Sequence, residues 1–454
     1  MRKILAHIAI LAVAFIAACS LFPQDEPVTW VHDIAPIVHK SCSPCHRPGT
    51  PAPFDLLTYE DVAKRSKMLK FVTETRYMPP WPADHHYTNF LDEKILTDTE
   101  IELFARWHKQ GAPLGPKEDM PPIPQFSEGS MLGEPDLVIP VPPYLVQGNN
   151  RDNFLMIKAP YQIGQDTFVR MAEFVPGRNQ LVHHMNGHMI RYATGAKSTV
   201  FGGDRIVDTE AFLDKEAFVK LDLLNDDGTY PTLVPLVANY LPGVIASAYP
   251  EGIGGFKISA EGAFLINDMH YAPSPLAKWD SSHINLFFMK ETPKRPTSEI
   301  QLGTLGISPI EPPLVIPPEK VMTFRTKTQV HVDISVLTIN PHMHLLGKSF
   351  WAYALTPEGD TIRLIRIPKW DFHWQYFYTY KHLVKIPKDS WIYVEAVFDN
   401  TSGNPDNPYN PPQLIAERNG SMRTTDEMLQ FIITYMPYQE GDEKISLKSE
   451  FFPE

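Results

Sequence analysis

Proline constrains the fold of this chain more than any other residue. It accounts for 44 of the 454 residues, roughly twice the usual proportion. Because proline lacks an amide hydrogen and has a fixed φ angle, it interrupts helices and is confined to loops, turns and strand edges. The sequence therefore predicts a mainly β protein with many short strands.

Proline clusters also divide the chain into parts. The cluster between residues 113 and 143 predicts a stiff linker, which we place at residues 115–134. A second cluster, between residues 309 and 318, separates the remaining sequence into regions 135–310 and 311–454. Each region has the length of a single domain.

The composition excludes several classes of protein. The hydrophobic content is 43% and the charged content is 21%, which are ordinary values for a globular chain and exclude a disordered, collagenous or multi-span membrane protein. The formal net charge of −12 gives no electrostatic basis for binding nucleic acid.

Short runs of β-branched and aromatic residues recur through both regions, separated by Pro, Gly and Asn. Such runs are typical of antiparallel strands, so we expect two consecutive β-sandwiches. The eight clearest runs are residues 168–174, 181–192, 264–271, 284–289, 330–339, 361–367, 391–398 and 429–435.

The N-terminus has the pattern of an export signal. Two basic residues precede an apolar run from Ile4 to Ala18, which is shorter than the ~20 residues of a membrane-spanning helix. The run ends in a sequence that resembles a bacterial lipobox. This implies a signal peptide at residues 1–18, a lipidated Cys19, a tether at 19–27, and a lipoprotein anchored in the membrane of the bacterial cell envelope, on its periplasmic or outer-surface face. The alternative is a plain signal peptide cut after Ala18, with an unmodified Cys19.

The other two cysteines lie in Cys42-Ser43-Pro44-Cys45-His46, which has the spacing of covalent c-type haem attachment. The thiols of Cys42 and Cys45 would reach the two vinyl groups, and His46 would turn onto the iron. A redox or zinc Cys-x-x-Cys site is the alternative, but the sequence has no second cysteine pair to complete a zinc site.

Helix signals lie on both sides of this motif. Apolar residues recur at helical spacing from Ile34 to Val38, and Thr97-Asp98-Thr99-Glu100 is a capping box that predicts a helix ending before Gly111. This order of elements resembles a class I cytochrome c, which implies a small all-α haem domain over residues 28–114.

The second axial ligand of the haem is expected in the loop between these helices. We select Met78, in the stretch Met78-Pro79-Pro80-Trp81, because the prolines stiffen the loop that holds its thioether. Met68, His85 and His86 are the competitors. We expect Met68 in a helix and in the core, and the two histidines in solvent.

Five histidines in the β regions stand where a core seldom explains them. His342 and His344 alternate along a predicted strand, so both can point to one face. His183 and His184 are adjacent and can bind one ion only if the strand bulges or ends there. His270 ends an apolar run, and nearby Asp268 is either its partner or a group that orients a ring.

The order Val182-His183-His184-Met185, Met269-His270-Tyr271, His342-Met343-His344-Leu345-Leu346-Gly347-Lys348 and Asp426-Glu427-Met428 closely resembles the copper motifs of the ascorbate-dependent type II copper monooxygenases. This family includes peptidylglycine α-hydroxylating monooxygenase and dopamine β-monooxygenase. The resemblance implies two jelly-roll-like β-sandwiches with one copper ion each.

The resemblance also implies the ligand sets. His183, His184 and His270 would hold one copper, and His342, His344 and Met428 would hold the second, catalytic copper. The remaining histidines of the region match no ligand position and are expected to be structural; they are His188, His283, His331, His373 and His382. A thioether ligand favours Cu(I) and is a poor ligand for zinc, so a set containing Met428 selects copper.

One part of the family pattern is missing. The peptide-amidating relatives hold the substrate carboxylate with an Arg and a Tyr at the positions of Asn340 and Ile432. We therefore expect a less charged small-molecule substrate, although Arg191, Arg363 or Arg366 could replace the missing groups.

The sequence thus predicts a copper-dependent monooxygenase that hydroxylates an aliphatic C–H bond with dioxygen. Electrons would be supplied or relayed by the fused c-type haem, after reduction by an ascorbate-like reductant or a redox protein. One alternative is a haem and copper electron-transfer or copper-handling lipoprotein without oxygenase activity. Another is a surface binding module with purely structural histidines.

Overall fold

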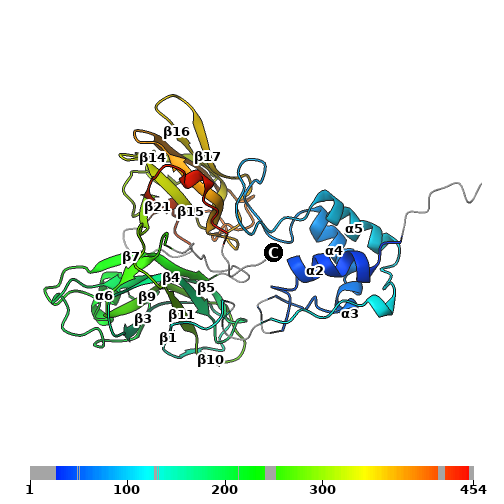
Figure 1. Ribbon diagram of the computed structural model, residues 1–454, viewed down its shortest axis with the longest axis horizontal. Coiled ribbons are helices and arrows are strands. Elements are labelled where there is room, and N and C mark those ends of the chain that lie inside the picture. Colours follow the sequence, from blue (N-terminus) through cyan, green and yellow to red (C-terminus); the bar gives the residue numbers. More distant parts are fainter. Residues whose placement is uncertain are drawn as a thin grey trace, which may run out of the picture. The chain divides into compact units, whose positions relative to one another are not determined.

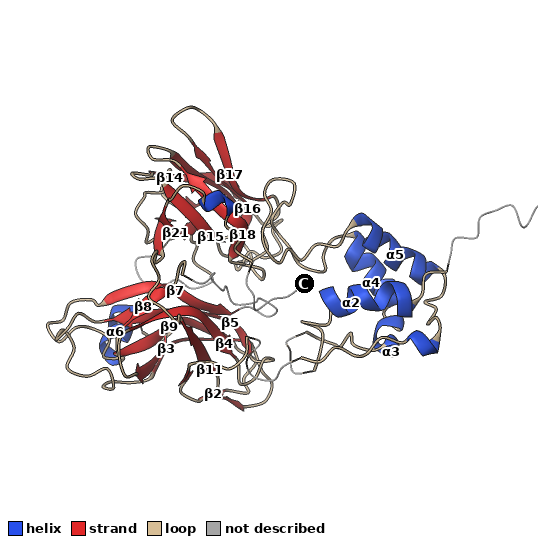
Figure 2. Cartoon of the chain, in the orientation of Figure 1, coloured by secondary structure: helices blue, strands red, loops and turns tan. Residues whose placement is uncertain are grey.

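The structure is a computed structural model that describes residues 27–48, 50, 52–126, 130, 132–212, 214–240, 252–417 and 425–448. It is mainly β, as predicted, and its strands pair in antiparallel sheets (Figure 2). The chain forms two compact units. The first comprises Met1–Ser43, Leu56–Pro79 and Leu96–Pro124, and the second comprises Pro44–Asp55, Pro80–Ile95 and Gln125–Glu454.

The first unit contains short helices (Figure 1). They are η1 (Trp30–Ile34), α2 (Ala35–Ser41), α3 (Tyr59–Ala63), α4 (Ser66–Glu74), α5 (Asp98–Lys109) and η2 (Lys117–Asp119). The predicted capping box of α5 is confirmed, because Thr97 and Glu100 each accept a hydrogen bond from the other's backbone N–H. Gly111 follows with φ +83°, a conformation that glycine adopts without strain.

Buried aromatic and aliphatic side chains hold this unit together. Trp30, Phe104 and Trp107 are almost completely buried, as are the apolar residues at helical spacing before Cys42. Met68 does lie in a helix, α4, but the expectation that it belongs to the core is wrong. Its side chain is 37% exposed, because it lies on the solvent side of a short helix whose buried face carries Leu69 and Thr73.

Two larger sheets and one strand pair make up the earlier part of the β region. The five-stranded sheet has the order β6 (Ile206–Asp208), β3 (Asn153–Gln162), β9 (Glu261–Tyr271), β5 (Val182–Arg191) and β7 (Thr232–Tyr240). The four-stranded sheet has the order β1 (Leu137–Pro140), β11 (His283–Phe288), β4 (Thr167–Val175) and β8 (Phe256–Ile258). Strands β2 (Tyr144–Val146) and β10 (Lys278–Asp280) pair separately, and α6 spans Asp214–Lys220.

The later part repeats this arrangement with two four-stranded sheets. One has the order β12 (Ser298–Gly303), β21 (Gln430–Pro437), β15 (Ile334–His342) and β18 (Tyr378–Ile386). The other has the order β14 (Lys320–Gln329), β19 (Trp391–Asn400), β16 (Gly347–Leu355) and β17 (Thr361–Ile367). Strands β13 (Val315–Ile316) and β20 (Ile415–Ala416) pair separately, and η3 spans Asp442–Lys444.

Each of the eight runs predicted as strands overlaps a strand, and β17 has the predicted bounds. The run 330–339 begins too early, because β15 spans Ile334–His342. Several strands were missed, and β3 shows why. It contains Lys158 and Pro160, which break an apolar pattern, yet Lys158 is completely buried and its Nζ donates a 2.5 Å hydrogen bond to the carbonyl of Gly202. A distant backbone acceptor makes this residue compatible with a central strand.

Arg295 lies in the segment that connects the earlier sheets to the later ones, between β11 and β12, and it is held there by hydrogen bonds. Its carbonyl accepts a hydrogen bond from Gly254, and its guanidinium contacts both oxygens of Asp442 at 2.5 and 2.6 Å. Ser335 donates to the same carboxylate at 2.5 Å. This nearly buried ion pair links the strand connection to the C-terminal segment.

No helix in the described ranges is long and apolar enough to cross a membrane. The predicted signal peptide and the predicted lipidated Cys19 lie outside the described residues.

Candidate metal centres

Three of the predicted ligands lie together on the five-stranded sheet. His183 and His184 come from β5 and His270 from the neighbouring strand β9. Each ring offers one nitrogen, and these three atoms all lie within 4.8 Å of one another. Two nitrogens bound to one ion at about 2 Å each lie at most about 4 Å apart. The Nδ1 atoms of His183 and His184, at 3.2 Å, already meet this limit.

A β-bulge allows adjacent histidines to share this site. In the β5–β9 pairing Val182 lies opposite Tyr271 and His184 opposite His270, so His183 is the extra residue. A bulge removes the strict alternation of side chains along a strand. The side chains of His183 and His184 can therefore both face one ion, which the sequence allowed only if the strand bulged or ended here.

Two carboxylates orient the rings of this cluster. The Nε2 of His184 lies 2.7 Å from Asp268, and the Nε2 of His270 lies 2.7 Å from Asp152. Because each Nε2–H donates to a carboxylate, Nδ1 is left with its lone pair. The Nδ1 of His270 is buried without a hydrogen-bond partner. A buried nitrogen with a free lone pair fits a metal ligand. Of the two carboxylates, Asp268 orients the His184 ring, as the sequence suggested for a histidine ring. Asp152 was not found from the sequence.

Burial favours the neutral form of His183 and His270, which is the form that binds metal. Burial lowers the pKa of His183 to about 3, with help from His184 and His270. Burial also lowers the pKa of His270. Burial alone would raise the pKa of Asp268, but the His184 ring next to it lowers that pKa to about 2.

A second cluster forms where β15 ends. His342 is the last residue of this strand and His344 follows two positions later, with ring centroids 5.1 Å apart at an interplanar angle of 88°. The Nδ1–H of His344 donates to the carbonyl of Asp426 at 2.9 Å. Its Nε2 is thereby the nitrogen that can bind an ion.

Glu427 ties this cluster to Met428. Its buried carboxylate accepts hydrogen bonds from the backbone N–H groups of His344 at 3.0 Å, Leu346 at 2.6 Å and Met428 at 3.2 Å. Two segments far apart in the sequence are thus held by one side chain. The structure therefore places the backbone of Met428 beside the His342–His344 turn, and Met428 itself is buried.

Burial also dominates the electrostatics here. It lowers the pKa of His342 to about 3, with a further contribution from His344, and it lowers the pKa of His344. Burial raises the pKa of Glu427 to about 8, against the opposing effect of its three N–H donors. The charge of Asp268 acts on both His342 and His344, so the two clusters lie within electrostatic reach of each other.

The loop between β17 and β18 contacts both clusters and was not anticipated. Its Phe372 ring lies 5.8 Å from that of His344, and its His373 ring lies 6.1 Å from that of His183. The side chain of Gln375 interacts with His342 and offsets a small part of the lowering of the His342 pKa by burial. The sequence offered no motif here, and His373 was expected to be merely structural.

The positions of the missing carboxylate anchor are neighbours in space. Asn340 lies directly opposite Ile432 in the β15–β21 pairing, and the Asn340 amide donates to the carbonyl of Tyr376 at 3.0 Å. Neither side chain carries a charge. Of the possible replacements, Arg363 lies over the Tyr87 ring and Arg366 lies 3.8 Å from Asp84.

The haem motif follows α2, with Cys42 as the C-terminal cap of that helix. The Nδ1 of His46 lies 3.1 Å from the carbonyl of Phe54, to which it can donate. This leaves Nε2 for an iron ion, as in other axial histidines. Met78 belongs to the first unit and His46 to the second. The pairing of Met78 with His46 therefore stays a prediction.

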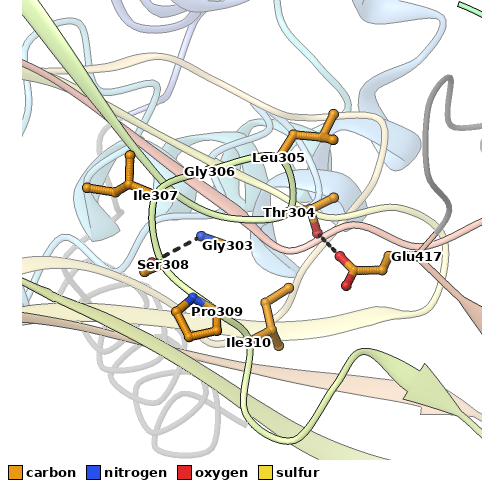
Figure 3. Close-up of a pocket in the computed structure, with 9 residues that line it drawn as sticks. All are labelled: Gly303, Thr304, Leu305, Gly306, Ile307, Ser308, Pro309, Ile310 and Glu417. Carbon is orange, nitrogen blue, oxygen red and sulfur yellow. Dashed lines mark hydrogen bonds between the residues drawn. The ribbon is translucent and has the colours of Figure 1, made fainter.

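A pocket of about 290 Å³ lies in the later part of the β region, formed by the loop 303–310 and Glu417 (Figure 3). Thr304 donates to Glu417 at 3.0 Å across it. None of the predicted ligands lines this pocket. It therefore supplies no argument about the metal clusters.

Comparisons with known proteins leave the question of function to these sites. No family model matches the sequence, and no curated protein matches it. Among solved structures, the chain is similar to the "Structure of infectious bursal disease virus Gx strain". The identity is 9%, the match covers 68% of this chain and 72% of that chain, and the TM-score is 0.15. This likeness carries no argument.

Proposed function

We propose that this protein is a copper-dependent monooxygenase that hydroxylates an aliphatic C–H bond of a small molecule with dioxygen. The observation that carries the proposal is the convergence of two histidine clusters in one unit, with the Nδ1 of His270 buried and unpartnered. His183, His184 and His270 would hold one copper, and His342, His344 and Met428 the other. When bound, the two coppers would supply one-electron redox chemistry and dioxygen activation.

The protein prepares both sites by fixing its own side chains. Asp152 and Asp268 hold two rings with Nδ1 directed away from the carboxylates. Glu427 holds the segment of Met428 against the turn that carries His344. Preorganised ligands lose little freedom when an ion binds, and a thioether in the second set discriminates against zinc.

The absence of charge at Asn340 and Ile432 supports a substrate without a terminal carboxylate. A peptide carboxylate placed there would lose its hydration without gaining a cationic partner from either residue. We therefore propose an uncharged or weakly charged aliphatic substrate.

We propose a cytochrome c domain over residues 28–114, joined by the linker 115–134 to two jelly-roll-like sandwiches. The helices of the first unit support it, whereas Pro44–Asp55 and Pro80–Ile95 of this range belong to the second unit. Cys42, Cys45, His46 and Met78 would hold the haem. The orientation of His46 by Phe54 fits this role. An ascorbate-like reductant or a redox protein would be the external electron donor, and Cys19 would anchor the chain in the bacterial cell envelope.

The decisive experiment measures oxygen uptake by copper-loaded, reduced protein with a panel of uncharged aliphatic compounds, together with product analysis. We expect substrate-dependent uptake that is lost in His342→Ala and Met428→Ala. The exposed His331 provides the matched control, because His331→Ala removes a histidine outside both clusters. Full activity in either ligand variant would reject the assignment of the catalytic copper.

A second candidate is an electron-transfer or copper-handling lipoprotein. The missing carboxylate anchor favours it, because electron transfer and copper handling need no charged group at Asn340 and Ile432 to hold a substrate. In this case the reduced protein would reoxidise in air at a rate independent of every compound tested. No hydroxylated product would form.

A further inference from the structure

The loop that joins β17 to β18 links three parts of the second unit. We call residues Trp370–Tyr376 the aromatic loop. Its Phe372 ring lies 5.8 Å from His344, and its His373 ring lies 6.1 Å from His183. A single loop of seven residues therefore contacts both candidate copper clusters.

The other end of the aromatic loop contacts the segment that follows Met78. The Tyr376 ring lies 5.5 Å from the Trp81 ring, and its hydroxyl donates to the carbonyl of Pro80 at 3.0 Å. Trp81 also packs 5.3 Å from Tyr378. Pro80 and Trp81 are two and three positions after the predicted haem ligand Met78. The aromatic loop therefore contacts two residues that closely follow Met78 in the sequence.

Part of the haem-attachment motif belongs to the same unit as this aromatic group. Cys45, Trp81 and Tyr376 all lie in the second unit.

Three hydrogen bonds to backbone carbonyls restrain the aromatic loop, two from backbone N–H groups and one from the side-chain amide of Gln375. Trp370 N–H donates to Lys348 at 2.9 Å, Trp374 N–H to Asp371 at 3.0 Å, and the Gln375 amide to Phe372 at 2.9 Å. The rings of Trp374 and Tyr376 are stacked at 6.4 Å. Fixed rings in close contact suit electron tunnelling, because its rate falls steeply with each added ångström of gap.

We propose that Trp81 and the aromatic loop are the electron-entry path of this protein, from the predicted haem to the copper clusters. This inference rests on the proposed function. In each transfer one electron leaves ferrous haem, which becomes ferric, and reduces one Cu(II) to Cu(I). The external one-electron donor then reduces the haem again. No bond forms or breaks, and no proton transfer is required.

The test uses the full-length protein with haem attached and copper bound, without oxygen or substrate. A light-activated one-electron donor reduces the haem. Its reoxidation is followed by haem absorbance, and the loss of Cu(II) is followed by electron paramagnetic resonance. We expect Trp81→Leu to slow reoxidation by about tenfold or more, and Trp81→Phe to restore most of the rate. Trp391→Leu is the matched control, because Trp391 begins β19 and its ring lies 5.1 Å from the Lys327 Nζ.

A second variant keeps the test independent of the folding of the first. Phe372→Leu alters the opposite end of the path, beside His344, and we expect it to slow the loss of Cu(II). Reoxidation at the wild-type rate in both Trp81→Leu and Phe372→Leu would overturn the proposal, and so would the absence of haem-to-copper transfer in the wild-type protein.

The fate of the proposed function is measured separately. With an ascorbate-like reductant that reaches copper directly, Trp81→Leu should hydroxylate substrate at the wild-type rate, which supports a role in electron entry alone. Wild-type protein that transfers electrons from haem to copper and yet hydroxylates nothing would reject the monooxygenase. The electron path would stand in that case.

Discussion

The Nε2 atom of His270 lies 2.7 Å from a carboxylate oxygen of Asp152, a residue 118 positions earlier in the chain. This pair fixes the ring of His270 so that Nδ1, which is buried and without a hydrogen-bond partner, is available beside His183 and His184. The cluster therefore depends on a carboxylate that no sequence motif includes.

We predict that Asp152→Ala lowers the copper affinity of the first cluster by about 10- to 100-fold, because the His270 ring loses its orienting partner. Competition titration with a copper chelator measures this change. Asp166→Ala is the control, since it removes a carboxylate that pairs with Lys257 instead. Equal affinity in the wild-type and Asp152→Ala proteins would show that the carboxylate does not position the ligand.

The Glu427 carboxylate should stabilise the turn that carries His344 even without copper. Glu427→Gln replaces one of two oxygens that accept from three backbone N–H groups with an amide NH2, which cannot accept, so we expect a loss of about 2 kcal/mol in the free energy of unfolding. Denaturant unfolding of the metal-free protein measures it. The exposed Glu440 offers the control substitution Glu440→Gln, which should leave stability unchanged. An equal loss in both variants would argue against a specific role for Glu427.

Met428 should determine which metal and which copper oxidation state the second cluster prefers. In Met428→Leu we expect the affinity for Cu(I) to fall by about tenfold or more, while the preference for copper over zinc weakens. Chelator competition under anaerobic conditions reads both quantities. Met322→Leu serves as the control, because Met322 lies on β14 and matches no ligand position. Unchanged Cu(I) affinity in Met428→Leu would mean that its sulfur does not bind the ion.

The Arg295–Asp442 pair predicts a pH dependence of stability. Burial alone would raise the pKa of Asp442, but hydrogen bonds from Arg295 and Ser335 hold it below its ordinary value. A lowered folded pKa stabilises the fold above the unfolded pKa, and this contribution is lost as the pH falls through the folded pKa. Asp442→Asn should therefore cost about 3 kcal/mol at neutral pH, and much less once the pH has fallen below the folded pKa of Asp442.

Denaturant unfolding of the metal-free protein across this pH range provides the measurement for Asp442→Asn. The corresponding control is Asp333→Asn, at a more exposed carboxylate that lies 3.5 Å from Lys385. A destabilisation by Asp442→Asn that stays constant down to the most acidic pH would contradict the ionic origin of the effect.

Much of the fold could be predicted from local patterns. Strand β17 alternates and is bounded by turns, so its limits follow from the sequence, and the capping box of α5 depends on residues only three positions apart. Strand β3 was missed because the acceptor that satisfies Lys158 lies in a loop 44 residues later. Long-range contacts of this kind leave no local signature.

The same division applies to the site. The sequence suggested that His183 and His184 need a bulge, and the structure supplies it. It did not suggest that Asp152 contacts His270 or that His373 contacts His183. In each pair the two residues are more than 100 positions apart in the sequence. Local spacing can propose ligands, but the groups that orient them are selected by the fold.

The central claim is that two copper clusters in this chain transfer one oxygen atom from dioxygen to an aliphatic carbon. The most direct measurement incubates copper-loaded, reduced protein with isotopically labelled dioxygen and a panel of uncharged aliphatic compounds, and determines the label in any product by mass spectrometry. The account predicts one labelled oxygen atom in a hydroxylated product, with none formed by His342→Ala. A product whose oxygen comes from water, or oxygen consumption without any hydroxylated product, would contradict it.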